Sequence, residues 1–168
     1  AGGLFAYQMF DHVQRRVEAW IRPFDDFTGS GFQIAQRLFA LGSGSLTGSG
    51  LGLGEPNRIP FASTDFIFAA VGEEMGYAGT IAVLAGFTLL TAAGFGIALR
   101  ARDVFRKFLA SALTLLLAVQ AILILGGVLR VMPVTGITLP FMSYGGSSLL
   151  TNLVMITLLA RISHGERA

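Results

Sequence analysis

Residues 75–99 read MGYAGTIAVLAGFTLLTAAGFGIAL, an apolar run without a charged side chain. A helix needs about 20 such residues to cross the hydrocarbon core of a bilayer. Two further runs of similar length follow at residues 108–129 and 140–160, the first holding Gln120 and the second the polar segment 143–148. The sequence therefore predicts three membrane-spanning helices.

The composition of the whole chain supports a membrane protein. Of its 168 residues, 53% are hydrophobic and 13% are charged, and the mean hydropathy is +0.67. Soluble domains carry about 25% charged residues. The net charge of +2 is too small to indicate a nucleic-acid partner. The absence of cysteine excludes disulfides and thiolate metal sites.

Basic residues gather in the short segment between the first two predicted spans. Its charged residues are Arg100, Arg102, Asp103, Arg106 and Lys107. Short cytoplasmic loops carry such an excess of Lys and Arg. The tail after the third span is also basic, through Arg161, His164 and Arg167. Both signals place these segments in the cytoplasm, so the region before the first span is expected outside the cell.

This orientation divides the chain into three parts. Residues 1–10 are too short to span a bilayer, and we interpret them as the end of a transmembrane helix. Residues 11–64 are then a large extracellular loop, and residues 65–168 hold three transmembrane helices and a cytoplasmic C-terminus. We therefore expect an all-α fold, a polytopic membrane protein with a single membrane domain whose N-terminal part precedes this chain.

The extracellular loop contains periodic and glycine-rich segments. Apolar residues recur at helical spacing from Phe10 to Ile21, with polar residues between them, so an amphipathic helix in the membrane interface is predicted to end before Pro23. A second short helix is predicted at residues 32–41. The glycine-rich residues 42–54 are predicted to be a flexible connector, because GxG patterns without a preceding strand are weak phosphate signals.

Asp65 stands where this outer loop turns into a membrane helix. One interpretation is a helix N-cap, favoured by the helix dipole. The other is a general base beside a membrane-bound substrate. Both can hold, since the N-terminal position keeps the carboxylate ionised.

An acidic pair, Glu73 and Glu74, follows on the same predicted helix. A charged side chain inside the bilayer costs roughly 2.5–3.5 kcal/mol, so two acids in a membrane helix are expected to have a compensating partner or a function. At about 100° per residue, Glu73 lies about 80° around a continuous helix from Asp65 and Glu74 about 180°. At most one of them shares a site with Asp65. Pairing with basic groups on helices outside the chain is favoured for Glu74, whereas Glu73 stays open.

The last outer turn, residues 130–140, leads into the polar segment 143–148 of the third span. The small residues there allow close helix packing. Alternatively the helix is interrupted, and its free amides and hydroxyls bind an anionic group such as a pyrophosphate. The candidate substrate-binding residues are Arg58, Arg130, Thr135, Ser143, Ser147 and Ser148.

Two stretches carry a resemblance to a known family. Residues 64–76 read TDFIFAAVGEEMG, and residues 133–148 read PVTGITLPFMSYGGSS. Both closely resemble the SEDS family, which includes FtsW, RodA and SpoVE, and residues 15–33 look like that family's large extracellular loop. The resemblance implies that the chain is the C-terminal portion of a ten-helix protein, with three to four transmembrane helices and the large loop with its amphipathic helices.

The resemblance also implies a function. Family members are peptidoglycan glycosyltransferases that polymerise lipid II into glycan strands at the outer face of the bacterial cytoplasmic membrane. Their partners are a class B penicillin-binding protein and other proteins of the division or elongation complex. The family's essential acid falls on Asp65. The donor is activated by a lipid pyrophosphate, whose charge basic side chains or a divalent cation, Mg²⁺ or Mn²⁺, would stabilise as it leaves.

The chain departs from the family at three places. Phe61 stands where many members have Glu, residues 122–126 lack an Asn found in many members, and Arg130 replaces a small or apolar residue. Roles tied to these positions are not carried over. Two other functions stay open: a lipid II flippase that uses the acidic pair, and a non-catalytic scaffold for the penicillin-binding protein. Without the upstream helices, the fragment alone is expected to be inactive.

Overall fold

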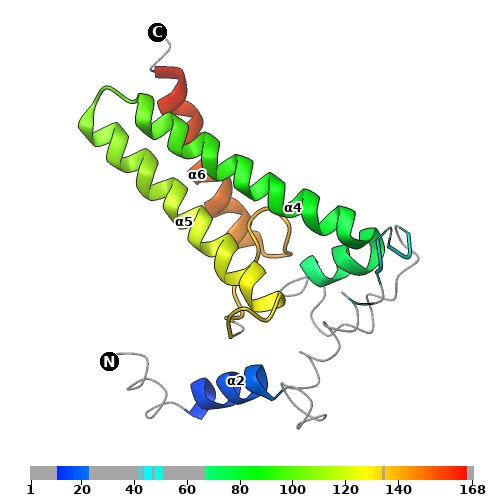
Figure 1. Ribbon diagram of the computed structural model, residues 1–168. Coiled ribbons are helices and arrows are strands. Elements are labelled where there is room, and N and C mark those ends of the chain that lie inside the picture. Colours follow the sequence, from blue (N-terminus) through cyan, green and yellow to red (C-terminus); the bar gives the residue numbers. More distant parts are fainter. Residues whose placement is uncertain are drawn as a thin grey trace.

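The computed structural model describes residues 11–22, 42, 44–46, 48–50, 67–133 and 135–165. These residues form four helices, labelled α2 (Asp11–Ile21), α4 (Ile67–Arg100), α5 (Val104–Val128) and α6 (Gly146–Gly165) (Figure 1). No strand occurs in these ranges. The predicted all-α class is confirmed.

Helices α4, α5 and α6 are long and apolar enough to cross a membrane. They contain 34, 25 and 20 residues, so even α6 extends over about 30 Å, the thickness of a hydrocarbon core. The three predicted spans are thus confirmed. The third begins at Gly146 rather than at Pro140, because the backbone turns at Leu139, whose carbonyl accepts hydrogen bonds from the amides of Met142 and Ser143.

The three long helices pack side by side (Figure 1), and α4 and α5 share the largest interface. Small residues allow the close approach of α4 and α5: a methyl group at Gly94 would overlap the side chain of Thr114. The Thr114 hydroxyl donates to the Ala110 carbonyl (2.8 Å), which satisfies it inside the apolar contact. Large side chains such as Leu89 and Leu116 stay exposed, as expected on faces that lipid or further helices cover.

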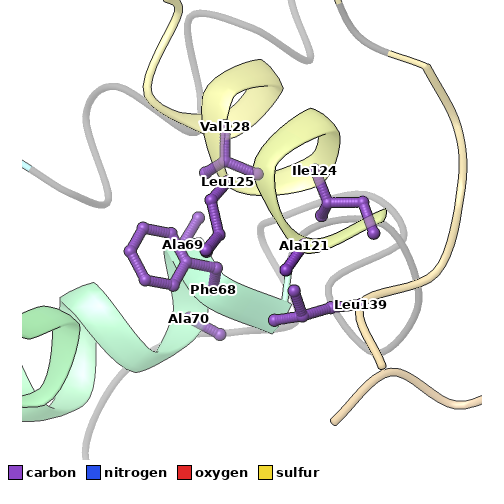
Figure 2. Packing of buried hydrophobic residues seen from close by; sticks show 8 residues of the cluster. All are labelled: Phe68, Ala69, Ala70, Ala121, Ile124, Leu125, Val128 and Leu139. Atoms are coloured by element: carbon purple, nitrogen blue, oxygen red, sulfur yellow. The ribbon is translucent and has the colours of Figure 1, made fainter. Parts of the chain in front are cut away.

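A cluster of eight buried residues fixes the beginning of α4 (Figure 2). Phe68 is fully buried and lies among side chains of α5 and Leu139, which belongs to the segment before α6. Burial of one large apolar side chain contributes about 1.5–3 kcal/mol. The first turn of α4 is therefore held in place against α5 and the α5–α6 connection.

Candidate functional site

Helix α4 is broken at Gly76, whose φ of 63° and ψ of −155° are not helical. In an unbroken helix the Tyr77 amide would donate to the Glu73 carbonyl. Instead it donates to the Ser45 carbonyl (3.1 Å). The Glu73 carbonyl accepts from the amide (3.0 Å) and the hydroxyl (3.1 Å) of Ser49. The glycine-rich segment thus satisfies the backbone groups that the break releases.

Glycine is required on both sides of this contact. A side chain on Gly44 would overlap the Gly72 carbonyl, and one on Gly48 (φ 76°) would overlap the backbone of Glu74. A Cβ on Gly76 would come within 2.5 Å of the Gly48 nitrogen. The prediction of a flexible connector is therefore wrong for the described residues 44–46 and 48–50, which dock on α4.

The acidic pair Glu73 and Glu74 is half-buried and lies just before the break. The break separates the pair from Tyr77–Arg100, the long apolar part of the helix. The backbone carbonyls of both residues bind the glycine-rich segment: that of Glu73 accepts from Ser49, as described above, and that of Glu74 accepts from the Gly50 amide (3.0 Å). A role of the two carboxylates inside the membrane stays a prediction.

Arg130 and Trp20 hold α2 against the connection that follows α5. The Trp20 indole donates to the Arg130 carbonyl (2.9 Å). In return the Arg130 guanidinium donates to the carbonyls of Trp20 (Nε, 3.1 Å) and Ile21 (Nη2, 3.0 Å). A cation is favourable at a helix C-terminus, where carbonyls lack partners. The predicted amphipathic helix is confirmed at Asp11–Ile21, and Arg130 caps it.

Arg130→Ala is expected to release α2. Hydrogen bonds to charged groups contribute about 1.5–3 kcal/mol, so amide hydrogen exchange at the end of α2 should accelerate by roughly tenfold or more. Mass-spectrometric exchange on peptides covering residues 11–22 measures this. Arg100→Ala removes the same charge from the other end of the spans and should leave these peptides unchanged. Equal protection of α2 in Arg130→Ala and wild type would contradict the clamp.

A partly buried polar network joins α5, α6 and the segment between them. Ser148 accepts hydrogen bonds from the Thr138 hydroxyl (2.8 Å) and the Asn152 amide (3.3 Å). The Gln120 amide, on α5, donates to the Thr138 carbonyl (2.9 Å). Asn152 is 1% exposed, so it is deep within the packed helices. The network ties the irregular segment before α6 to both spans, and sequence reasoning had flagged only Gln120 and Ser148 in it.

The other predicted binding residues are dispersed. The Ser143 hydroxyl accepts from the Leu139 amide (2.8 Å), whereas Ser147 is exposed at the start of α6. Thr135 lines a cavity of about 10 Å³ among apolar side chains, room for a single water at most. Asp65 and Arg58 lie outside the described residues, and so does the predicted helix at residues 32–41. The described part of the chain therefore does not gather the predicted binding set into one pocket.

No group of three or more His, Asp or Glu side chains that could hold a metal ion occurs in the ranges that the structure describes. A metal site built only from those residues is therefore not supported. A divalent ion at the predicted site would need Asp65 or oxygens of the substrate as ligands.

Three apolar spans packed through small residues, one of them broken where the glycine-rich segment docks, define a polytopic α-helical membrane protein. The model of the cell cycle protein family of FtsW, RodA and SpoVE matches residues 3–168. The chain belongs to this family.

Curated relatives cover almost the whole chain. The peptidoglycan glycosyltransferase RodA of Mycobacterium tuberculosis is 50% identical over 167 residues, which are 99% of this chain and 36% of the relative. The probable peptidoglycan glycosyltransferase FtsW of Geobacter metallireducens is 42% identical over 95% of this chain and 43% of its own length. The stage V sporulation protein E of Bacillus subtilis is 42% identical over 91% of this chain and 42% of its own length.

A solved structure has the same fold. It comes from work on the structural coordination of polymerization and crosslinking by a peptidoglycan synthase complex. The TM-score is 0.74 at 30% sequence identity, and the match covers 95% of this chain and 44% of the solved chain. The present chain thus spans less than half the length of these relatives.

Proposed function

We propose that the chain is part of a peptidoglycan glycosyltransferase that polymerises lipid II into glycan strands during division or elongation. The observation that carries the proposal is the 50% identity over 167 residues to the RodA glycosyltransferase of M. tuberculosis. The activity belongs to the whole protein, since this chain spans 36% of that relative.

Asp65 is the general base of the proposed reaction. It precedes Ile67 by two residues in the sequence, and the adjoining turn of α4 is anchored by the fully buried Phe68. The carboxylate takes the proton of the acceptor sugar hydroxyl, whose oxygen attacks the anomeric carbon of the donor. As that carbon–oxygen bond forms, the bond from the anomeric carbon to the lipid pyrophosphate breaks. The reaction requires that Asp65 be held within hydrogen-bond reach of the hydroxyl.

The leaving pyrophosphate needs positive charge or hydrogen-bond donors. We retain Arg58 and the exposed Ser147 as candidates for binding the pyrophosphate. Arg130 can contribute only those guanidinium N–H groups that do not bind the carbonyls of α2. A divalent cation, Mg²⁺ or Mn²⁺, belongs to the proposal as a counterion of the pyrophosphate. Activity lost in EDTA and restored by either ion supports it, whereas full activity in EDTA removes it.

The proposed site faces outside the cell, and a labelling experiment tests this orientation. A cysteine in place of Ser45, an exposed residue of the docked loop, should react with a membrane-impermeant thiol reagent in intact cells. A cysteine in place of Asp103, in the basic loop between α4 and α5, should react only after the cells are opened. The reverse labelling pattern would contradict the orientation and the outer-face chemistry with it.

A class B penicillin-binding protein is the proposed partner. The similar solved chain comes from a peptidoglycan synthase complex that couples polymerisation to crosslinking, and exposed apolar side chains on the spans leave surface for another membrane helix. Other proteins of the division or elongation complex belong to the same proposal.

Labelled lipid II in vesicles that carry the full-length protein distinguishes the three candidate functions. Glycan strands support the glycosyltransferase. Transbilayer movement of lipid II without strands would replace it by a flippase. Neither strands nor movement, with the penicillin-binding protein still bound, would leave only a scaffold.

A further inference from the structure

Arg130 occupies a position at the end of α5 where glycine is the usual residue. The helix ends in a Schellman motif, in which two amides beyond the helix turn back to its last carbonyls. The Val131 amide donates to the Gly126 carbonyl (2.8 Å), and the Arg130 amide donates to the Gly127 carbonyl (3.4 Å). Leu129 is the C-cap, so Arg130 is the first residue beyond it. Its φ of 61° is left-handed, as the motif requires.

An arginine in this conformation is strained. Left-handed backbone brings the Cβ too close to the following carbonyl oxygen, which costs residues other than glycine roughly tenfold in population. A glycine at this position would make the same two backbone hydrogen bonds without that cost. The end of α5 itself therefore gives no reason for an arginine, and the offset has to come from other contacts of Arg130.

Those contacts all lead to α2, which lies beside the end of α5 (Figure 1). The guanidinium donates to the carbonyls of Trp20 (3.1 Å) and Ile21 (3.0 Å). The Arg130 carbonyl accepts from the Trp20 indole (2.9 Å). The direction of this carbonyl depends on the backbone conformation of Arg130, so leaving the left-handed form turns the acceptor away from the indole. Arg130 thus links α2 to the end of α5 through both its side chain and its main chain.

The balance of these contributions favours the docked form. A hydrogen bond to a charged group is stronger than one between neutral groups, and a single such bond already matches the strain. With all three bonds made, the left-handed form of Arg130 is held firmly. Without them, the strain acts against the Schellman bonds with no offset, and the end of α5 opens more readily.

We propose that Trp20, Ile21 and Arg130 form a conformational latch that couples the docking of α2 to order at the end of α5. While α2 is docked, the connection to α6 begins from a fixed point. When α2 leaves, the strain at Arg130 loosens the start of that connection. The latch rests on backbone geometry and hydrogen bonds, so it does not depend on the proposed glycosyltransferase activity.

Two substitutions at the same residue test the latch by hydrogen exchange of the detergent-purified full-length protein. Arg130→Ala and Arg130→Gly both remove the guanidinium, so both should accelerate exchange in peptides covering residues 11–22 by about tenfold. Alanine keeps the left-handed strain, whereas glycine removes it. Peptides covering residues 126–133 should therefore exchange about tenfold faster than wild type in Arg130→Ala, but within about twofold of wild type in Arg130→Gly.

Trp20→Phe tests the coupling from the side of α2. Phenylalanine keeps an aromatic ring but removes the indole N–H that binds the Arg130 carbonyl. Exchange in residues 126–133 should accelerate about fivefold, the equivalent of one neutral hydrogen bond, although the substitution is 110 residues away in sequence. In the Arg130→Gly background the same substitution should change this exchange by less than about twofold, because no strain is left to release.

The two comparisons decide the proposal. Equally fast exchange at residues 126–133 in Arg130→Ala and Arg130→Gly would overturn the latch, because loss of the side chain alone would then loosen α5. An unchanged end of α5 in folded Trp20→Phe would reduce Arg130 to a cap of α2 without coupling. Should Trp20→Phe fail to fold, the two Arg130 variants decide alone.

Discussion

Asp65→Asn is expected to reduce glycan-strand synthesis by roughly 10²–10⁴-fold, the contribution of a positioned general base. Asparagine keeps the size of the side chain and can still accept a capping hydrogen bond, but it does not take up a proton. If Asp65 is only a helix cap, the change costs about 1 kcal/mol or less and leaves the rate nearly intact. The measurement is lipid II polymerisation by wild type and variant at matched folded amounts.

Asp103→Asn provides the matched control. Asp103 caps α5, where its carboxylate accepts from the Arg106 amide (3.1 Å), so the same substitution is made at a structural cap. It should lower stability by about 1 kcal/mol or less and leave polymerisation unchanged. Asp65→Asn should in addition leave expression and binding of the penicillin-binding protein intact. An Asp65→Asn rate within a few-fold of wild type would end the catalytic assignment.

Gly76→Ala is expected to destabilise the protein by about 3–5 kcal/mol. The φ of 63° and ψ of −155° at Gly76 belong to a region essentially reserved for glycine, which costs other residues about 1–3 kcal/mol. The added Cβ would also lie 2.5 Å from the Gly48 nitrogen, 2.8 Å from the Ser45 oxygen and 2.9 Å from the Gly44 oxygen. These are backbone atoms, so relief requires the docked loop to move away from α4.

Thermal unfolding of the detergent-purified protein measures the effect, and the melting temperature should fall by roughly 10 °C. Gly86→Ala makes the same change on the same helix at an exposed position with no atom within 4 Å. It should leave the melting temperature unchanged or slightly higher, since alanine favours helix over glycine by about 1 kcal/mol. Similar losses in both variants would show that the break is not held by close packing.

Much of the fold could be predicted because a membrane span is visible in the sequence as one continuous apolar run. The uncharged residues 75–99 correspond to Tyr77–Arg100, and the predicted residues 108–129 correspond to α5, Val104–Val128. Hydropathy predicts that the third span starts at Pro140, six residues before the observed start at Gly146, because it does not register the turn at Leu139.

The contacts of α2 and of the glycine-rich segment could not be predicted, because they join residues far apart in sequence. Trp20 and Arg130 are 110 residues apart, and Ser49 bonds to Glu73 across 24 residues. The sequence of a glycine-rich segment does not indicate whether the segment is free or docked. The partners of its amides, the carbonyls that the break in α4 releases, are visible only in the structure. Sequence reasoning reached Asp65 through its match to a family motif, since a single acid at a helix start is more often a cap.

The most direct test of the central claim exchanges the matching segment of M. tuberculosis RodA, 50% identical over 167 residues, for this chain. The chimera is reconstituted in vesicles with its class B penicillin-binding protein and labelled lipid II. We predict glycan strands at a rate comparable to the parent RodA, and their loss when the grafted chain carries Asp65→Asn. A well-folded chimera that makes no strands, or one that makes them equally well with Asp65→Asn, would contradict the account.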